Sequence, residues 1–356
     1  MRFTYEALPG RIVAAPGALD LVRDEVELLG GRKVFLIVDQ AAQGYGDQVE
    51  RQLGHRLAAR WNEAIQHVPV ELAERALVAA TTAGADVLVS IGGGSATGLA
   101  KILALDLKLP ILAVPTTYAG SEMTPIYGST GDRHKRVGRS LDVLPRVVVY
   151  DPLLTLSLPE SVAGPSAFNA IAHSVEALWM PQANPITSAL AIEGIRAICA
   201  SLPIVMATPD HVDARSELQY GACLSGMALA QTGTGLHHKL CHVLGGTFNL
   251  IHADTHSVIL PHALAYNAAA LGSDLARLAA ALGVADDDAP GGIWDLAVRC
   301  AIPTSLAALG LRADHLTEAA ARAAVEITAN PVPIAEADLL AMLSRAHAGV
   351  RPSSSP

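Results

Sequence analysis

The 356-residue sequence has few charged residues and no excess of positive charge. Each of these two features excludes a class of protein. Only 17% of the residues are charged and 51% are hydrophobic, which argues against extensive disorder and for a well-buried globular chain. The formal net charge of −9 makes binding to nucleic acid or to an acidic membrane unfavourable. An anionic substrate would need a local positive pocket.

The sequence also lacks a long apolar run, a secretory leader and a cysteine framework. No run approaches the roughly eighteen uninterrupted apolar residues of a membrane span. The opening "MRFTYEALPGR" has no basic segment followed by an apolar one, so no signal peptide is expected. The cysteines are widely spaced with no CxxC pair, which predicts reduced thiols and a cytoplasmic protein. They are Cys199, Cys223, Cys241 and Cys300.

The length favours two domains, and the first half has the pattern of an α/β fold. Continuous apolar runs alternate with helix-length segments, which indicates parallel strands buried on both faces. The expected strands are 33–39, 85–94, 109–117 and 145–152, and the expected helices are 17–30, 45–59 and 71–84. We therefore expect a dinucleotide-binding domain with a parallel Rossmann-like sheet over residues 1–157.

The second half is rich in alanine and leucine with a 3.6-residue period and almost no strand-like run. Helices are expected at 186–207, 214–233, 273–283 and 337–349. We therefore expect an all-helical substrate and catalytic domain over residues 158–356.

The segment "VSIGGGSATGLAK" predicts an anion-binding turn. A buried strand ends in Gly92–Gly94, Ser95 follows as the expected N-cap, and a helix runs on toward Lys101. Glycines let the backbone approach a diphosphate, and a helix N-terminus presents free N–H groups. The spacing is neither GxGxxG nor GxxxxGK[ST], and a tight turn without a ligand is the alternative.

Two further features lie at the expected carboxyl ends of strands, where open α/β sheets bind ligands. "VPTTYAGSEMTP" offers the hydroxyls of Thr116, Thr117, Tyr118 and Ser121. Asp39 closes the "FLIVD" strand, where an acid can accept from ribose hydroxyls or cap the following turn.

Histidines are concentrated in one short segment of the second half. Six of the 13 lie between residues 237 and 262: His237, His238, His242, His252, His256 and His262. The pairs His238/His242 and Asn169/His173 have the i, i+4 spacing of one helix face. Imidazoles on facing helices are a common plan for transition metals, although any single histidine is better explained as structural. We expect His256 and His262 to be structural or to support the ligands from behind.

The combination "GGGS…AK", "PTT…GSE", Asn/Asp-xxx-His and His-xxx-His-x9-His resembles the iron-containing, or group III, alcohol dehydrogenase superfamily. "FTYEALPGRIV", "GGGSATGLAK", "PTTYAGSEMTPIYG" and "FNAIAHSVEALW" look like its maleylacetate reductase branch. The resemblance implies the dehydroquinate synthase-like architecture of an α/β domain followed by a helical domain. It also implies NADH- or NADPH-dependent reduction of the C=C bond of maleylacetate, a small dicarboxylate, to 3-oxoadipate in aromatic compound degradation, by a homodimer.

The resemblance assigns roles to individual positions. Its cofactor residues correspond to Asp39, Gly93, Gly94, Ser95, Thr116, Thr117 and Lys135. Its metal ligands correspond to Asn169, His173, His238 and His252, and its pocket histidine to His242. The superfamily's usual loop aspartate is Gly98 here, and its usual acidic ligand is Asn169.

The amide at position 169 suggests that the metal site is vestigial and that metal is absent. A carboxylate partly neutralises a dication and an amide does not, so metal should bind less tightly. Hydride added β to the ketone of maleylacetate gives a delocalised enolate, which a histidine could stabilise and protonate. We expect His242, His238 or His252 in that role and Tyr118 to orient the substrate. His237, Lys239 and Arg139 are weaker candidates for the substrate carboxylates.

Three rival functions remain open at this stage. The nearest is a metal-dependent (Fe or Zn) alcohol or hydroxyacid dehydrogenase on the same scaffold, which chelation would inactivate. A lyase of the dehydroquinate synthase type would use NAD without consuming it. A non-enzymatic nucleotide-binding protein is the third. Asp39 would repel a 2′-phosphate and favours NADH, although Arg32 or Lys33 could soften that preference.

Overall fold

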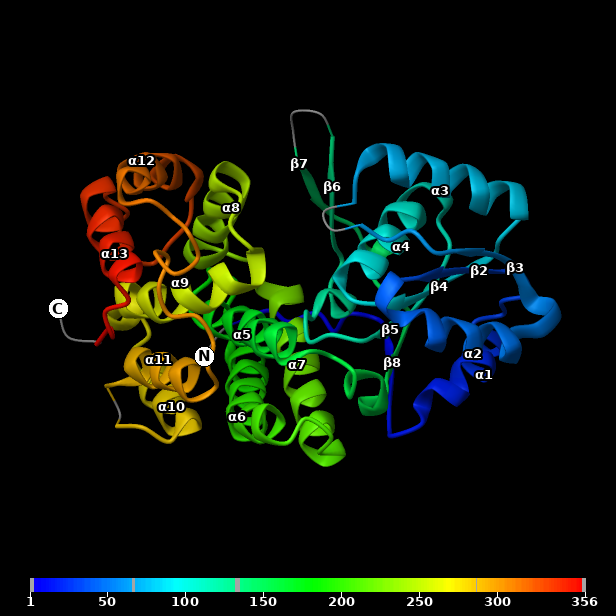
Figure 1. Ribbon diagram of the computed structural model, residues 1–356, viewed down its shortest axis with the longest axis horizontal. Helices are drawn as coiled ribbons and strands as arrows, with labels where there is room; N and C mark the ends of the chain where they lie inside the picture. Colours follow the sequence, from blue (N-terminus) through cyan, green and yellow to red (C-terminus); the bar gives the residue numbers. More distant parts are fainter. Residues whose placement is uncertain (1–2, 66–67, 132–134, 286, 354–356) are drawn as a thin grey trace. The chain divides into compact units, whose positions relative to one another are not determined.

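The computed structural model describes residues 3–65, 68–131, 135–285 and 287–353, with the side chains of Lys135 and Arg136 outside the described set. The chain forms two compact units. One is Glu6–Leu158, and the other is Pro159–Pro356 together with the segment before Glu6. Figure 1 shows strands and helices in the first unit and helices in the second.

The first unit contains a six-stranded parallel sheet in the order β1-β8-β5-β4-β2-β3. Its strands are β1 (Arg11–Ala14), β2 (Val34–Val38), β3 (Leu57–Trp61), β4 (Val87–Gly92), β5 (Ile111–Pro115) and β8 (Val147–Tyr150). Strands β2, β4, β5 and β8 are buried along their whole length, as a sheet covered on both faces requires. The predicted α/β fold with a parallel sheet is confirmed.

Helices cover both faces of this sheet (Figure 1). They are α1 (Val22–Leu28), α2 (Gln43–Leu53), α3 (Val70–Ala83) and α4 (Gly94–Leu107). Successive side chains of a strand point to opposite faces of the sheet. Leu36 packs in the core with α1 and α2, while Phe35 packs with α3 and α4. This alternation explains why the strands read as continuous apolar runs in the sequence.

One predicted helix boundary in this unit is wrong, and other strands were missed. Residues 57–59 belong to strand β3, whereas the sequence predicted a helix through residue 59, because this edge strand is only half-buried and lacks a continuous apolar run. Strand β1 at the opposite edge was missed for the same reason. The antiparallel pair β6 (Ile126–Thr130) and β7 (Lys135–Arg139) was also missed.

The described part of the second unit is helical, as predicted. Its helices are α5 (Glu160–Ala177), α6 (Pro185–Ala207), α7 (Val212–Thr232), α8 (Leu236–Phe248), α9 (His252–Asn267), α10 (Ser273–Leu282), α11 (Ala289–Arg299), α12 (Leu316–Glu326) and α13 (Glu336–Ala348). Helices α6 and α7 approach closely at two glycines, since a Cβ on Gly221 would lie 2.8 Å from the carbonyl oxygen of Gly194. Ser174 of α5 donates a 2.8 Å hydrogen bond to Ser225 of α7. This packing fixes α5, which carries part of the candidate site.

Helix α6 is long and apolar enough to cross a membrane by length and composition alone. Half of its most apolar window is buried inside the structure, where it packs against α5, α7 and α10. Core helices pass the same test of length and composition. We therefore interpret α6 as the central helix of its unit.

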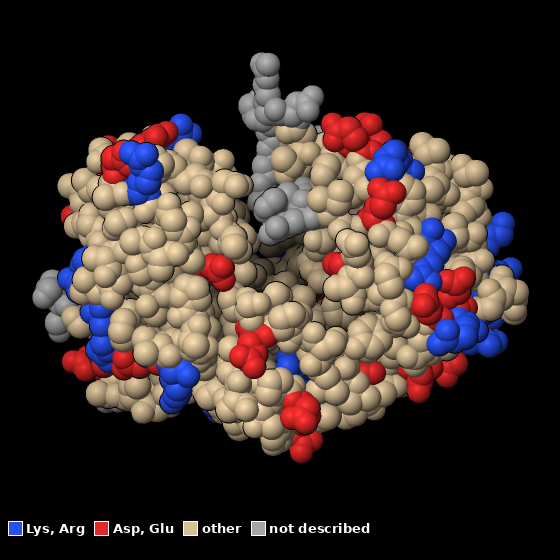
Figure 2. Space-filling model, in the orientation of Figure 1, with Lys and Arg blue, Asp and Glu red and all other residues tan. Residues whose placement is uncertain are grey.

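Charged side chains of both signs are interspersed on the face shown in Figure 2. Ion pairs join several charged side chains of the protein: Arg60 contacts Asp47 and Glu50, and Arg351 contacts Asp288 and Asp295. Such pairs add little stability individually. On this face no broad basic area stands out that would attract a polyanion.

Candidate functional site

The glycine loop joins β4 to α4 and has the geometry of an anion-binding turn. Gly92 has a φ of 147°, and a Cβ there would lie 2.4 Å from the Cβ of Asp39, so only glycine fits. Gly93 is the N-cap of α4 and makes no side-chain cap hydrogen bond. The prediction that Ser95 is the N-cap is therefore wrong, because the helix already begins at Gly94.

The N-terminus of α4 leaves room for a ligand. A Cβ on Gly94 would meet only the Cβ of Ala119, at 3.9 Å, and Gly94 itself is exposed. The first amides of a helix have no intrahelical acceptor and lie at the positive end of its dipole. These amides can therefore hold a phosphate group without help from a lysine.

The threonine loop after β5 packs directly against the glycine loop. The amide of Thr116 donates to the carbonyl oxygen of Gly92 at 3.0 Å, and a Cβ on Gly93 would lie 3.1 Å from Cγ2 of Thr117. Both threonines are half-buried, and the two predicted cofactor loops are thus brought together. Tyr118 is fully buried, and its role in orienting substrate stays a prediction.

Asp39 lies next to this loop at the carboxyl end of β2. Its amide donates to Ile91 at 2.9 Å, and its side chain accepts from the amide of Ala41 at 3.2 Å, so it caps the short helix Gln40–Ala42. The capping alternative is therefore observed, while the contact with a ribose stays a prediction. Lys33 precedes β2, and the five residues of this strand separate the main chains of Lys33 and Asp39 by roughly 20 Å. Lys33 and Arg32 therefore cannot offset the charge of Asp39.

Lys101 has a structural function that the sequence did not reveal. Its ammonium donates to the carbonyl oxygens of Ser121, Thr124 and Ile126 at 2.6, 2.8 and 2.8 Å. Burial lowers the pKa of Lys101 to about 7, and the charge of Glu122 opposes that shift. The lysine thus ties α4 to the segment that follows the threonine loop.

Two basic residues proposed from the sequence lie on β7. Lys135 begins this strand, and its side chain is outside the described set. Arg139 is exposed at the other end of the strand. Their proposed contacts with cofactor and substrate stay predictions.

The second unit gathers a cluster of imidazoles from α5, α8 and α9. His173 of α5 stacks on His238 of α8, with ring centroids 4.9 Å apart and 16° between the planes. His242 stacks on His252 of α9 in the same way, at 5.7 Å and 13°. The predicted histidines from three helices are therefore in one place.

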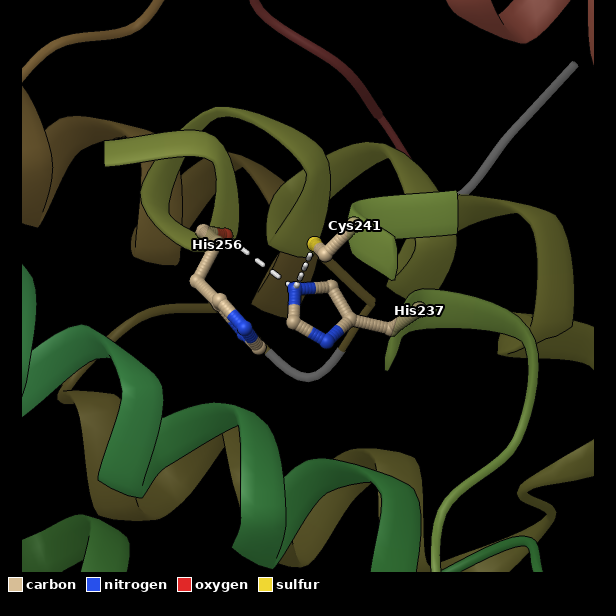
Figure 3. Close-up of side chains that lie close together, drawn as sticks. All are labelled: His237, Cys241 and His256. Carbon is tan, nitrogen blue, oxygen red and sulfur yellow. Dashed lines mark hydrogen bonds between the residues drawn. The ribbon is translucent and has the colours of Figure 1, made fainter. Parts of the chain in front are cut away.

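His256 and His237 also belong to this cluster, and the position of His237 corrects one prediction. His256 Nε2 lies 2.9 Å from His252 Nε2, so His256 lies directly behind His252, which fits its predicted supporting role. His237 is fully buried, and its Nε2 lies 3.1 Å from the carbonyl oxygen of His256 and 3.7 Å from Sγ of Cys241 (Figure 3). It is not available to a substrate carboxylate. Lys239, the other weak candidate in this unit, is half-buried on α8.

Glu176 is the acid that the sequence analysis missed. It is fully buried on α5, and its Oε2 lies 2.6 Å from Nδ1 of His238. Its Oε1 accepts from the amide of His237 at 2.8 Å, at the N-terminus of α8. The spacing Asn169, His173, Glu176 is i, i+4, i+7 on one helix face, which could have identified it.

Burial makes the interior of the cluster a poor place for positive charge. Burial and, to a lesser extent, the neighbouring imidazoles lower the pKa of His173 to about 3, and burial lowers the pKa of His237 to about 4. The pKa values of His238 and His256 are well below the usual range for the same reasons. Burial raises the pKa of Glu176 to about 7, against main-chain donors at the start of α8. These four histidines are therefore neutral near pH 7.

Several buried polar atoms in the cluster have no protein partner among the described residues. They include Oδ1 of Asn169, Nδ1 of His173, Nε2 of His238 and Nδ1 of His256. Unpartnered buried acceptors are costly unless water, a ligand or a cation completes them. An amide oxygen and neutral imidazole nitrogens are suitable ligands for a divalent cation. The residues that would hold such a cation are Asn169, His173, His238 and His252.

Family models match both halves of the chain. The iron-containing alcohol dehydrogenase model matches residues 9–152, and the C-terminal model of the Fe-containing alcohol dehydrogenase family matches residues 165–347. The second match includes the whole histidine cluster, and the first includes both cofactor loops.

Individual relatives match over nearly the entire length. A maleylacetate reductase of Burkholderia cepacia is 47% identical over 351 residues, covering 99% of both chains. One of Sphingobium indicum is 45% identical over 352 residues, again covering 99% of each. The crystal structure of maleylacetate reductase from Agrobacterium tumefaciens superposes with a TM-score of 0.95 at 43% identity, covering 99% of this chain and 100% of that one.

Proposed function

The chain belongs to the iron-containing alcohol dehydrogenase family, and from this premise we propose that it reduces the C=C bond of maleylacetate to 3-oxoadipate with NADH or NADPH. The observation that carries the proposal is the full-length similarity to maleylacetate reductases at 40–47% identity. The glycine and threonine loops and the histidine cluster provide sites for the two reactants. A metal-dependent alcohol dehydrogenase is not favoured, because these full-length relatives are named maleylacetate reductases.

The chemistry of the substrate fits the groups in the cluster. A bound reduced nicotinamide supplies a hydride to the carbon β to the ketone. The negative charge that develops is shared between the neighbouring carbon and the ketone oxygen, where a positioned hydrogen-bond donor stabilises it. A protonated imidazole then gives its proton to the carbon α to the ketone and becomes neutral. One hydride and one proton have then been added across the C=C bond. His242, His238 and His252 are the candidates for these roles.

We further propose that the cofactor is NADH and that the reaction does not depend on metal. Asp39 at the end of β2 would repel a 2′-phosphate, and Lys33 and Arg32 lie at the opposite end of that strand. The enolate needs less electrophilic assistance than an isolated alkoxide, and the neutral amide of Asn169 weakens the attraction for a dication. A bound cation would add a Lewis acid at the same place.

The location and assembly of the chain are also proposals. The four cysteines are buried thiols outside any disulfide bond, which suits a reducing cytoplasm. A homodimer rests on the family resemblance, and light scattering of the purified protein tests it.

The test is NADH oxidation with freshly prepared maleylacetate, with and without exhaustive chelation. We expect equimolar consumption of NADH and formation of 3-oxoadipate, unchanged by chelator, and a lower kcat/KM with NADPH. Turnover that disappears with the metal and returns with Fe²⁺ or Zn²⁺ would contradict metal independence. A steady NADH concentration during substrate loss would contradict the reductase function itself.

A further inference from the structure

The hydrogen bonds of His237 fix the position of its ring hydrogen. Its Nε2 lies 3.1 Å from the main-chain oxygen of His256, which can only accept, so Nε2 carries the hydrogen (Figure 3). A neutral imidazole has one N–H, and therefore Nδ1 of His237 presents a lone pair. That lone pair lies 3.3 Å from Nδ1 of His238.

Two neighbours, His237 and Glu176, determine which ring nitrogen of His238 carries the hydrogen. Two lone pairs would repel at 3.3 Å, so Nδ1 of His238 carries its hydrogen and faces the lone pair of His237. The same Nδ1 lies 2.6 Å from Oε2 of Glu176. The other carboxyl oxygen accepts from the amide of His237 at 2.8 Å, at the N-terminus of α8. Glu176 is thus an acceptor for His238 Nδ1–H.

We propose that Glu176 and His237 are positioning residues that hold His238 as the Nδ1–H tautomer, leaving its Nε2 as an acceptor for a ligand. His238 Nε2 is buried and has no protein partner among the described residues, as this assignment requires for an atom reserved for a ligand. The chain from the His256 carbonyl through His237 and His238 to Glu176 lies within the cluster and involves neither Asn169 nor His173.

The assignment narrows the chemistry that His238 can perform, a consequence that rests on the proposed function. A neutral ring with its hydrogen on Nδ1 can accept a hydrogen bond or hold a cation at Nε2, but it cannot donate from Nε2. His238 therefore does not protonate the substrate. The proton falls to His242 or His252, both of which are half-buried and not fully enclosed. When either imidazolium breaks its N–H bond as the substrate C–H bond forms, it is left neutral.

The same contacts show where the acidic side chain of the cluster lies. The acid expected at position 169 is an amide, but Glu176 supplies a carboxylate one hydrogen bond behind His238. A carboxylate in this place makes the imidazole a better acceptor at Nε2. The cluster therefore keeps an acidic side chain although its ligand position has lost one.

The tautomer can be measured directly in the full-length protein. Histidine labelled with ¹⁵N in the ring distinguishes protonated from unprotonated nitrogens by chemical shift, and loss of one signal set in His238→Gln assigns the residue. We expect a protonated Nδ1 and an unprotonated Nε2 for His238 in the unsubstituted protein. A hydrogen on Nε2 would overturn the proposal, and this outcome does not depend on any substrate.

A substitution at Glu176 links the tautomer to turnover. A glutamine amide has a single acceptor oxygen and can serve only one of the two donors that the carboxylate serves, so Glu176→Gln should move the His238 hydrogen toward Nε2. We expect kcat to fall about 10- to 100-fold, as when partners behind functional histidines are removed, with the KM for NADH unchanged. Glu176→Asp, which keeps the charge, should recover part of kcat and the original tautomer.

A matched control and the contrary outcomes complete the test. Glu217→Gln makes the same chemical change on the surface of α7, where Glu217 pairs with Arg196, and should leave both readouts unchanged. If Glu176→Gln alters the tautomer of His238 but keeps the full kcat, the role of Glu176 in the reaction is overturned. An unaltered tautomer in Glu176→Gln would overturn the role of Glu176. Absence of reductase activity in the unsubstituted protein would instead count against the proposed function.

Discussion

Asn169 is the residue at which this chain departs from the acid–histidine pair of a divalent metal site. Its side-chain oxygen is buried without a protein partner among the described residues, four positions before His173 on α5. The amide keeps the i, i+4 position of a ligand on the face of α5 that carries His173, but it contributes no charge. Glu176, three residues after His173, places an acidic side chain behind His238.

Restoring the acid tests this interpretation of position 169. Asn169→Asp should raise the affinity for Zn²⁺ or Fe²⁺ by about tenfold or more, because a carboxylate neutralises the cation where the amide cannot. Calorimetric titration of the metal-free protein measures the change, with Asn62→Asp on the surface as the control. Equal metal affinity and equal activity in the two forms would show that the interpretation is wrong.

His242 is the residue on which proton delivery is expected to depend most. His242→Ala should remove most of the turnover, about 100-fold or more for loss of a general acid, while NADH binding stays nearly intact. Steady-state kinetics and a fluorescence titration with NADH separate the two effects. His55→Ala changes an exposed histidine of the other unit and serves as the control. Normal turnover of His242→Ala would exclude the assigned role.

At the scale of elements, the strands that are buried along their whole length could be predicted from the sequence. Strands β2, β4, β5 and β8 are buried on both faces, and so each produces an unbroken apolar run. The edge strands β1 and β3 are partly exposed and carry polar residues, and no local pattern separated them from loop or helix. Long-range pairing stabilises them, and such pairing leaves little trace in local sequence.

The candidate site shows the same division between local and long-range information. The glycine loop and the i, i+4 pairs follow from local spacing and were found. Glu176 was missed because one glutamate in an alanine-rich helix is typical of an exposed face. The contact of His256 with His252 follows from their spacing on α9, but its place beside His237 depends on how α8 packs against α9.

The turn between β4 and α4 allows stability and cofactor binding to be separated. Gly92→Ala forces a side chain into φ 147° and against Asp39, and it should lower the free energy of unfolding by about 1–3 kcal/mol. Gly94→Ala meets only a distant methyl group, so the fold should be unaffected while the KM for NADH rises. Urea unfolding and kinetics of both variants measure this, and equal stability of the two would contradict the account of the turn.

At the scale of the whole molecule, the cofactor loops lie in one compact unit and the histidine cluster in the other. Each unit has its own hydrophobic core, with the sheet buried between two helical layers in the first and helices α8, α9, α12 and α13 enclosing a core in the second. The two functions are thus carried by structures that are stabilised separately. The family match over both halves indicates that the pair forms one enzyme.

Buried neutral histidines should make the molecule sensitive to acid. Burial lowers the pKa of His262 to about 4, while the unfolded value is about 6.5. Between these values the unfolded state binds the proton first, so stability is lost as the pH falls from 6.5 to 4, by roughly 3 kcal/mol for this residue. His262→Gln should reduce that loss in urea titrations at pH 7 and pH 5. An unchanged pH dependence would contradict the account.

The central claim is that hydride adds to the C=C bond and not to a carbonyl group. The direct measurement uses NADH deuterated at the transferring position, with maleylacetate as substrate and NMR spectroscopy of the product. The account predicts one deuterium on the carbon β to the ketone of 3-oxoadipate and an intact ketone. Deuterium on a newly formed alcohol carbon would contradict it and would identify a hydroxyacid dehydrogenase on the same scaffold.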